Sequence, residues 1–544
     1  MMRSVVVLIP AAGGSRDSLG RLSNFPAALA LVSGAPIICL ILEELIAMGL
    51  HDFRIGVSED YIEDFRYVTR KFNRTALIRL LPTDVKGSPV DTIRILSDSL
   101  PPNSSVLVNL GDTYCQWDLT DFQSHSVAIL MHPVSDSERW SMATADEIGY
   151  VTEIFEKGST PKAALGICGI YWWRDSQLFI DALKQVDLGS EISSILEKTN
   201  SQIFSKVPTM WIDSDRQDIL ENSRLSMVQA RSFNSITVDP YSGILIKKST
   251  NASKLSREIA YYQNLPSNLK SFFPRMFNFV HSETNPIQEL EYYSYPTLAE
   301  VYVYVSAPKF VWEKILHKLG RVVFESFASF PEDVESTNLE EIFIEKCVFR
   351  IPSLLDASSF PNSLLQESDL FINGNRYQGL NSLLEGSRRI LKSIQSPSTI
   401  IHGDFCLSNI MCDVNSTNIK LIDPRGGFET TSCFGPQIYD VAKLGHSILG
   451  KYDLITADQF SLESEDPSSA TYFLNIHTRD CHLMVEDLFY SHFVCDRYEP
   501  RLLKLVSGLI LLAIPVYHLE TPNRAIALFL QGIRMVSDAL EEFE

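Results

Sequence analysis

The stretch from His402 to Gly427, HGDFCLSNIMCDVNSTNIKLIDPRGG, places three polar side chains at set intervals between short apolar runs. Asp404 and Asn409 are five residues apart, so one loop can direct both into a single cleft. Asp423 follows nineteen residues after Asp404, and the runs NIMCD and IKLID between them read as two strands. A β-hairpin with Asx turns accounts for any one of these residues alone. The three together favour a loop that supplies a carboxylate base and oxygen ligands for Mg²⁺.

The stretch resembles the catalytic and metal-binding loops of the aminoglycoside phosphotransferase and choline kinase family, which has the protein-kinase-like fold. The resemblance covers roughly residues 237–544. It implies that Asp404 is the catalytic base, that Asn409 and Asp423 bind Mg²⁺, and that ATP is the phosphoryl donor. The run YDVAKLGHS matches the helix after the metal-binding aspartate of this family, and we expect its Asp440 to steady the catalytic loop.

The same resemblance calls for a lysine on a strand of the first lobe, held by a glutamate on the next helix. The run GILIKKS offers Lys247 and Lys248. Because neighbouring strand residues face opposite ways, only one of the two can point at a nucleotide. We expect Lys247 to do so, paired with Glu258 of LSREIAYY, and Lys248 stays the alternative.

The first 225 or so residues alternate apolar runs typical of strands with helical patterns, which favours an α/β sheet with crossover helices. The run LIPAAGGSR puts Gly13 and Gly14 at a strand end, where backbone N–H groups can approach phosphates. Asp112 ends the strand VLVNLGD, and Asp213 ends MWID. Two carboxylates at strand ends can hold one Mg²⁺ between a nucleotide and an attacking phosphate.

These pieces resemble the sugar-phosphate nucleotidyltransferase family, whose members join a nucleoside triphosphate to a phosphorylated small molecule and release pyrophosphate. The resemblance implies that Asp112 and Asp213 bind metal, that Arg16 faces the triphosphate, and that Lys157 of EKG contacts the acceptor phosphate. The sequence departs from the family at two points. The opening AAGGSR is one residue shorter than usual, and Ala27 stands where a lysine is expected.

The fold class that we expect is α/β: a Rossmann-like nucleotidyltransferase domain followed by a bilobal protein-kinase-like domain. We place these domains at residues 1–228 and 229–544. Within the second, the N-lobe spans about 235–297 and the C-lobe about 298–544. A helical insert near 330–395, where contacts to the acceptor are expected, shows no recognisable motif.

Composition limits the classes of molecule that the chain is expected to bind. The formal charge of −20 argues against a nucleic-acid-binding surface, so we expect small molecules and nucleotides, with a homo-oligomer left open. Nine cysteines without a CxxC pair indicate reduced thiols and a cytoplasmic protein. The apolar stretch Leu502–Leu519 contains Lys504 and Pro515, which favours a buried helix over a membrane span.

The two resemblances together predict a bifunctional enzyme. Its kinase domain would phosphorylate a small alcohol, sugar or acid with ATP, and its first domain would couple the product to CTP or UTP. Surface polysaccharide or head-group synthesis is the pathway expected by analogy. The alternative is an active kinase with a degenerate first domain that binds or acts as a scaffold, and a third reading is a non-enzymatic sensor or assembly protein. The acceptor and the nucleobase stay open.

Overall fold

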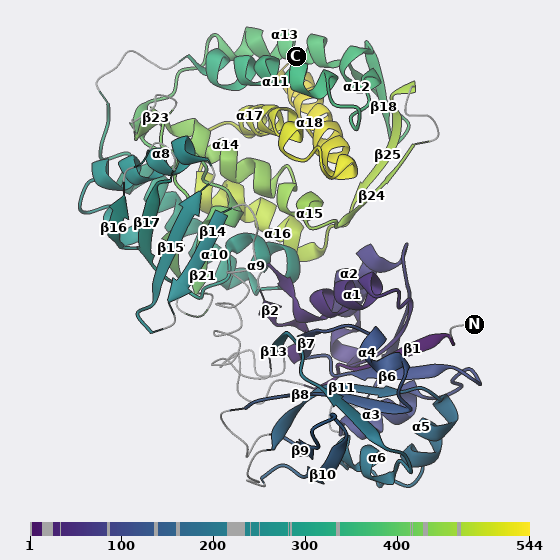
Figure 1. Cartoon of the computed structure of the whole chain (residues 1–544). Helices are drawn as coiled ribbons and strands as arrows, with labels where there is room; N and C mark the ends of the chain where they lie inside the picture. Colours follow the sequence, from purple (N-terminus) through teal and green to yellow (C-terminus); the bar gives the residue numbers. More distant parts are fainter. Residues whose placement is uncertain are drawn as a thin grey trace. The chain divides into compact units, whose positions relative to one another are not determined.

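The structure is a computed structural model of the 544-residue chain. The chain divides into two compact units, Met1–Val228 and Gln229–Glu544, and each is described by itself (Figure 1). The structure describes residues 3–13, 26–32, 34–83, 88–134, 140–158, 164–214, 234–239, 241–249, 251–280, 282, 285–332, 338–413, 415, 417–427, 433–464 and 469–543.

The first unit is built on a nine-stranded mixed sheet with the order β10-β9-β11-β6-β1-β4-β5, in which β8 pairs with β11 and β12. β1 runs parallel to β4 and β6, and β4 runs parallel to β5, whereas β11 is antiparallel to its neighbours. Two short strands, β7 and β13, form a separate antiparallel pair. The predicted α/β class is confirmed for this unit.

The described strands of the first unit are β1 Val5–Pro10, β2 Leu31–Val32, β3 Ala35–Pro36, β4 Asp52–Val57, β5 Leu77–Pro82, β6 Ser105–Asn109, β7 Thr113–Gln116, β8 Val127–His132, β9 Met142–Ala145, β10 Val151–Phe155, β11 Leu165–Trp173, β12 Ile203–Lys206 and β13 Met210–Asp213. The described helices are α1 Ile37–Ala47, α2 Ile62–Thr69, α3 Pro89–Leu96, α4 Thr120–Gln123, α5 Ser176–Leu183 and α6 Ser193–Lys198.

Local sequence explains these elements. The run VVVLIP of β1 is β-branched and buried at its centre, as befits a central strand covered on both faces. α3 begins with a capping box between Ser88 and Asp91 and has Pro89 in its first turn. The apolar faces of β1, β6, β8 and β11 share one core with α3, α5 and α6. This core places the carboxyl ends of β1 and β6 side by side.

The second unit begins with a four-stranded antiparallel sheet in the order β14-β15-β17-β16, against which α8 packs. The predicted hairpin SITVDPYSGILIKKS is β14 and β15. Beyond residue 297 the unit is mainly helical, and α17 and α18 lie side by side (Figure 1). All twelve residues of α14 are buried, so this helix runs through the core and carries its polar side chains inward.

The described strands of the second unit are β14 Asn234–Asp239, β15 Ile244–Ser249, β16 Met276–Val280, β17 Ile287–Glu291, β18 Asp369–Ile372, β19 Asn375–Gln378, β20 Ser398–Ile400, β21 Ile410–Asp413, β22 Asn418–Leu421, β23 Phe434–Pro436, β24 Phe460–Glu463 and β25 Thr471–Ile476. The described helices are α8 Ala252–Asn264, α9 Leu298–Tyr304, α10 Lys309–Arg321, α11 Lys346–Leu355, α12 Ser363–Gln366, α13 Leu380–Leu391, α14 Gln437–Ile448, α15 Tyr452–Thr456, α16 Asp480–Leu488, α17 Pro500–Ala513 and α18 Pro522–Phe543.

One stretch among the described residues, Pro500–Tyr517, has the length and hydropathy of a membrane span. Its mean hydropathy is 1.5, and 72% of it is buried inside the structure. Length and composition of this kind are equally typical of a core helix, and α17 packs on α18, α14 and α11.

Candidate functional site

The strand β15 turns Lys247 into the second unit and Lys248 out of it. Lys247 is 5% exposed, and its Nζ lies 2.7 Å from Oε2 of Glu258 on α8 and 2.6 Å from Oδ1 of Asp423. Lys248 is exposed. Burial opposes the charged ammonium, but the two carboxylates outweigh it and raise the pKa of Lys247. The lysine is therefore a permanent cation held beside Asp423.

The loop between β20 and the short 3₁₀ helix Leu407–Asn409 is held by α14. The Asp440 carboxylate accepts hydrogen bonds from the backbone N–H groups of His402, at 2.6 Å, and Gly403, at 2.9 Å. Gly403 has a φ of 78°, and a Cβ there would collide with the carbonyl oxygen of Gly426. The His402 carbonyl in turn accepts from the Gly426 N–H at 3.0 Å. The loop and the DPRGG segment thus pack backbone against backbone.

Asp404 lies at the centre of this loop and is paired with two cations. Its Oδ1 is 2.8 Å from Lys443 Nζ, and its Oδ2 is 2.9 Å from Arg425 Nη2. The Asp404 side chain is 8% exposed. Burial raises the pKa of this carboxyl, but Lys443 and Arg425 outweigh burial and hold the pKa well below its usual range. Asp404 is therefore ionised at neutral pH.

Asn409 and Asp423 supply oxygen atoms near Asp404. Asn409 Nδ2 donates to the Asp404 carbonyl at 2.9 Å, which turns its Oδ1 away from that carbonyl. Asp423 follows β22, has a φ of 55°, and its half-exposed side chain pairs with Lys247. Burial raises the pKa of Asp423, but Lys247 outweighs burial and keeps it below its usual value. The hairpin predicted between Asp404 and Asp423 is the antiparallel pair β21–β22.

An amide oxygen and an ionised carboxylate suit Mg²⁺, which takes oxygen ligands and often keeps only one or two from the protein, the rest coming from phosphates and water. Among the described residues, no three His, Cys, Asp or Glu side chains gather as a metal site. The pair Asn409 and Asp423 suits a cation whose other ligands come from nucleotide phosphates and water.

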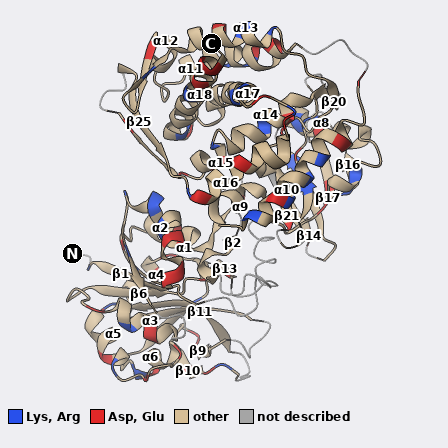
Figure 2. Ribbon diagram, turned by 180° about the vertical axis from the view of Figure 1, so that it is seen from behind, with Lys and Arg blue, Asp and Glu red and all other residues tan. Residues whose placement is uncertain are grey.

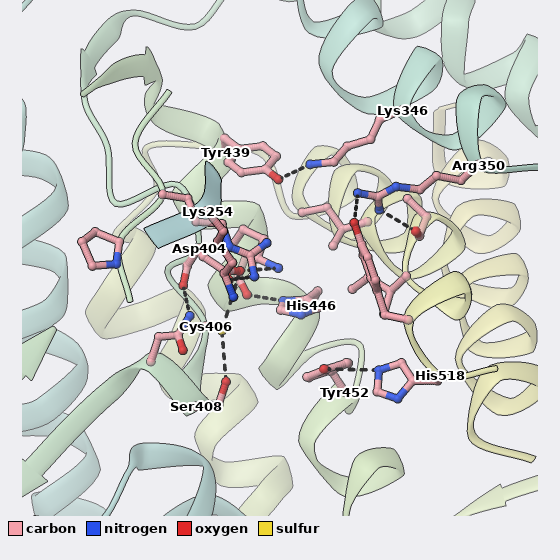
Figure 3. Close-up of a pocket in the computed structure, with 18 of the residues that line it drawn as sticks. Lys254, Lys346, Arg350, Asp404, Cys406, Ser408, Tyr439, His446, Tyr452 and His518 are labelled. Atoms are coloured by element: carbon pink, nitrogen blue, oxygen red, sulfur yellow. Dashed lines mark hydrogen bonds and ion pairs between the residues drawn. The ribbon is translucent and has the colours of Figure 1, made fainter. Parts of the chain in front are cut away.

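The Asp404 cluster opens into a cavity of about 490 Å³ (Figure 3). α8 contributes Lys254, Arg257 and Glu258 to its wall, and α11 contributes Lys346 and Arg350. Together with Arg425 and Lys443 the described wall has six cations and two carboxylates, Glu258 and Asp404. Figure 3 shows Lys346 and Arg350 extending from α11 toward this space.

His402 supports the loop as a neutral ring. It is fully buried, its ring stacks on Phe273, and it meets Phe405 edge-on. Its Nδ1 lies 3.3 Å from the Asp404 backbone N–H. Burial lowers the pKa of His402 to about 4, so the ring is uncharged at neutral pH and accepts that hydrogen bond.

In the first unit, β7 and β13 bring Asp112 and Asp213 together. Asp213 pairs in register with Thr113, and the Ser214 N–H donates to the Asp112 carbonyl at 2.9 Å. Gly111, directly before Asp112, lies against Ala11, where a Cβ would come within 2.7 Å of the Ala11 Cβ. The two aspartates therefore lie near each other, beside the carboxyl end of β1.

The other residues predicted in the first unit are less closely grouped. Gly13 is exposed, and its carbonyl accepts from the Ala27 N–H at 3.4 Å. Ala27 is 5% exposed, and its carbonyl accepts from Ser214 Oγ at 3.0 Å. Lys157 is half-exposed and pairs with Glu191 at 3.3 Å. The predicted residues Gly14 and Arg16 lie outside the described residues.

None of the six cations of the described cavity wall was predicted: Lys254, Arg257, Lys346, Arg350, Arg425 and Lys443. Lys443 follows Asp440 by three residues, a spacing that puts both on one face of a helix, and this signal is readable in the sequence. Arg425 stands within DPRGG, next to a predicted ligand. Lys346 and Arg350 are four residues apart in the insert without a motif, so nothing in the sequence ties them to Asp404.

Comparison with known proteins finds no matching family model and no matching curated protein. Solved structures match the N-terminal part of the chain. One is a putative glucose-1-phosphate thymidylyltransferase from Bacillus anthracis, in complex with a sucrose, at 20% identity over 42% of this chain and 97% of that chain, with a TM-score of 0.38.

Two further matches are HddC from Yersinia pseudotuberculosis in complex with GMP-PN, and an apo UDP-glucose pyrophosphorylase. HddC has 20% identity over 41% of this chain and 98% of that chain, with a TM-score of 0.33. The pyrophosphorylase has 15% identity over 42% of this chain and 100% of that chain, with a TM-score of 0.37. At these values the likeness concerns the fold of the N-terminal part and carries no argument about activity. The kinase-like assignment of the second unit stays a prediction.

Proposed function

We propose that the second unit transfers the γ-phosphoryl group of Mg²⁺-ATP to a hydroxyl group of a small molecule. The observation that carries this proposal is the pair of linked clusters, Glu258–Lys247–Asp423 and Lys443–Asp404–Arg425. An ionised carboxylate in a cavity rich in cations, beside oxygen ligands for Mg²⁺, matches the needs of phosphoryl transfer.

Asp404 acts as the base in this proposal. The acceptor hydroxyl oxygen attacks the γ-phosphorus, the bond to the bridging oxygen of the β-phosphate breaks, and ADP leaves. The hydroxyl proton passes to Asp404, which is ionised because Lys443 and Arg425 stabilise its charge. The same two cations lie where negative charge gathers on the transferred group and stabilise it.

The nucleotide is bound by the elements around β15 and α8. Lys247 pairs with nucleotide phosphates, while Glu258 holds the ammonium in place. Lys254 and Arg257 of α8 add positive charge to the same wall. Asn409 and Asp423 hold Mg²⁺, which neutralises phosphate charge when it is bound.

For the first unit we propose nucleotidyl transfer from a second nucleotide, CTP or UTP, to the phosphorylated product, with release of pyrophosphate. Support comes from the adjacent Asp112 and Asp213 beside the carboxyl end of β1, in a unit built on a mixed α/β sheet. The activated product would serve surface polysaccharide or head-group synthesis, in the cytoplasm.

A second candidate is that the first unit binds a nucleotide without turnover. Ala27 favours it, because this buried residue has no charge to offset that of a leaving pyrophosphate. Release of pyrophosphate indicates turnover, and its absence indicates binding alone. Ala27→Lys tests whether the missing charge at this position is what prevents turnover.

The deciding experiment measures ADP formation by the full chain with Mg²⁺-ATP and a panel of small alcohols, followed by pyrophosphate release with each nucleoside triphosphate. Asp404→Asn is expected to lower ADP formation at least about 100-fold, the usual range for loss of a general base. Asp487→Asn, an exposed α16 residue, is the matched control. Retention of the kinase rate in Asp404→Asn would overturn the assignment.

A further inference from the structure

The wall of the cavity formed by α11, α14, α15 and the segment after α17 contains no carboxylate among the described residues. Its polar members are Lys346, Arg350, Tyr439, Lys443, His446, Tyr452, Tyr517 and His518. Burial lowers the pKa of His446 and of His518, so both rings are neutral. Lys443 is paired with Asp404, so the other fixed charges on this wall are the two cations of α11.

Tyrosines orient both cations. Lys346 Nζ donates to Tyr439 Oη at 2.6 Å. Arg350 donates to the Ala513 carbonyl at 2.6 Å and to Tyr517 Oη at 2.8 Å, and its guanidinium carbon lies 4.8 Å from the centre of the Tyr517 ring. Among the described residues Arg350 forms no ion pair. Two of its five N–H groups are thus engaged by neutral oxygens, and its charge is not neutralised.

This wall lies close to Asp404. Burial lowers the pKa of Arg425, and Asp404 raises it most strongly, but Tyr439 and Tyr517 also contribute to raising it. The tyrosines that hold Lys346 and Arg350 are therefore neighbours of the guanidinium paired with Asp404. Asp404 and the two cations of α11 line the same cavity (Figure 3).

The cavity wall has more cations than binding of ATP and pairing with Asp404 require. Lys443 and Arg425 pair with Asp404, and Lys254 and Arg257 lie on α8 with the proposed nucleotide site. Lys346 and Arg350 are the two cations of the wall left over, and both are half-buried. The chain as a whole has a net charge of −20, and Figure 2 shows the charged residues along both units. Keeping Arg350 half-buried without an ion-pair partner among the described residues costs free energy unless an anion binds it.

The wall also disfavours a cationic acceptor. Aromatic rings bind quaternary ammonium groups through their faces. Here Lys346 lies 4.9 Å from the Tyr439 ring centre, and Arg350 covers the Tyr517 ring. The protein's own cations occupy these rings and repel a positively charged ligand.

We propose that the acceptor carries an anionic group of its own, a phosphate or a carboxylate, which Arg350 and Lys346 bind while its hydroxyl group faces Asp404. The inference rests on the proposed kinase function and names the substrate class of that site. The transfer itself is the one already described: the hydroxyl proton goes to Asp404, and ADP leaves.

Turnover with acceptors that differ in charge tests whether the site prefers an anionic acceptor. ADP formation by the full chain is compared for glycerol, glycerol 3-phosphate, glycerate and choline, which share hydroxyl chemistry and differ in charge. At least one of the two anions is expected to give a rate about 10-fold or more above that of glycerol, a difference of about 1.4 kcal/mol. The two anions distinguish a phosphate from a carboxylate. If the rate with glycerol or with choline is higher than the rates with both anions, the inference is overturned while the kinase assignment stays intact.

Binding tests the residues without any turnover. Inorganic phosphate is titrated by calorimetry into the full chain with a saturating non-hydrolysable ATP analogue and Mg²⁺. Arg350→Gln is expected to weaken phosphate binding about 10-fold, Arg350→Lys to retain part of the affinity, and Arg376→Gln, an exposed arginine of β19, to have no effect.

Equal phosphate affinity in Arg350→Gln and the wild-type chain refutes the anion subsite, provided that both melt at the same temperature. If Arg350→Gln melts lower, Tyr517→Phe replaces it as the deciding variant, because it frees the guanidinium from one partner and keeps the charge. In that variant unchanged phosphate binding again refutes the subsite, and an altered affinity supports it. A different result would contradict the kinase proposal itself: in that case Lys247→Met would leave the affinity for ATP unchanged.

Discussion

At the scale of single residues, the site depends on how charges are paired. Asp404 is a buried carboxylate that two cations keep ionised, and Lys247 is a buried ammonium that two carboxylates keep protonated. Each group alone would be neutralised by burial. The pairing thus keeps the proposed base and the proposed phosphate-binding cation charged inside one unit.

Lys443 is expected to control the pH dependence of turnover. In Lys443→Met, Asp404 loses the cation that most strongly lowers its pKa, so its pKa rises and the acidic limb of the kcat profile moves to higher pH. We also expect kcat at neutral pH to fall about 100-fold, because a cation near the transferred group is lost. Stopped-flow ADP assays from pH 5 to 9 measure both effects: Asp404 is expected to cause no acidic limb in the wild-type chain over this range, whereas Lys443→Met is expected to lose activity toward its acidic end. An identical pH profile in the two chains contradicts this role of Lys443.

His402 is expected to contribute a pH-dependent term to stability. Its pKa is about 4 in the folded chain and about 6.5 when unfolded, so the unfolded state binds more protons between these values. Its contribution is fully present above pH 6.5 and is lost as the pH falls toward 4. Between pH 6.5 and 5 the loss is about 1.5 kcal/mol.

Pulse proteolysis over a urea series, following fragments of residues 229–544, measures this term. The difference in unfolding free energy between pH 6.5 and 5 should shrink in His402→Gln by that amount. Comparing differences within each protein removes the pH-independent cost of the substitution. An identical pH dependence in both chains would show that His402 is not buried and neutral.

At the scale of elements, α14 organises the site. Its buried face holds the loop through Asp440 and the base through Lys443, one helical turn apart. The hairpin β21–β22 then returns the chain so that Asp423 meets Lys247 of β15. The hairpin and the helix follow from local pattern. The contact between β15 and the hairpin is a tertiary one, 176 residues apart in the chain.

Gly403→Ala is expected to disrupt the packing of the loop on the DPRGG segment. The φ of 78° strains any residue with a side chain, and a Cβ would also collide with the Gly426 carbonyl. Gly374→Ala is the control, because its φ of 80° is similar and nothing lies within 4 Å of the added Cβ. We expect about 1 kcal/mol of destabilisation in the control and at least about 2 kcal/mol in Gly403→Ala.

Urea unfolding of the second unit and the ADP assay measure the consequence. Gly403→Ala should lose most kinase activity, because Asp404 follows directly in the displaced loop, and Gly374→Ala should keep it. Equal effects of the two substitutions would mean that the close approach to Gly426 is unimportant.

At the scale of the whole molecule, two compact units each bring their own carboxylates together. The proposed sites share no residue: Asp112 and Asp213 belong to the first unit, and Asp404 and Asp423 to the second. Substitutions that share no partners add in free energy.

The two proposed activities are therefore expected to be separable in one chain. Asp112→Asn should abolish pyrophosphate release and leave ADP formation within about twofold, and Asp404→Asn should do the reverse when the phosphorylated acceptor is supplied. The double variant should combine both losses and no more. Loss of ADP formation in Asp112→Asn would show that the two sites depend on each other.

Local sequence pattern predicted the alternating strands and helices of the first unit and the hairpin between Asp404 and Asp423, through short-range periodicity and turn chemistry. The role of Asp440 in holding the loop was predicted from the resemblance to the kinase-like family. Tertiary packing alone shows that Lys247 faces inward and Lys248 outward, and that Lys443 and Arg425 meet on Asp404. It alone brought Lys346 and Arg350 to the same cavity, because packing of distant helices, unlike local pattern, decides which charges share a wall.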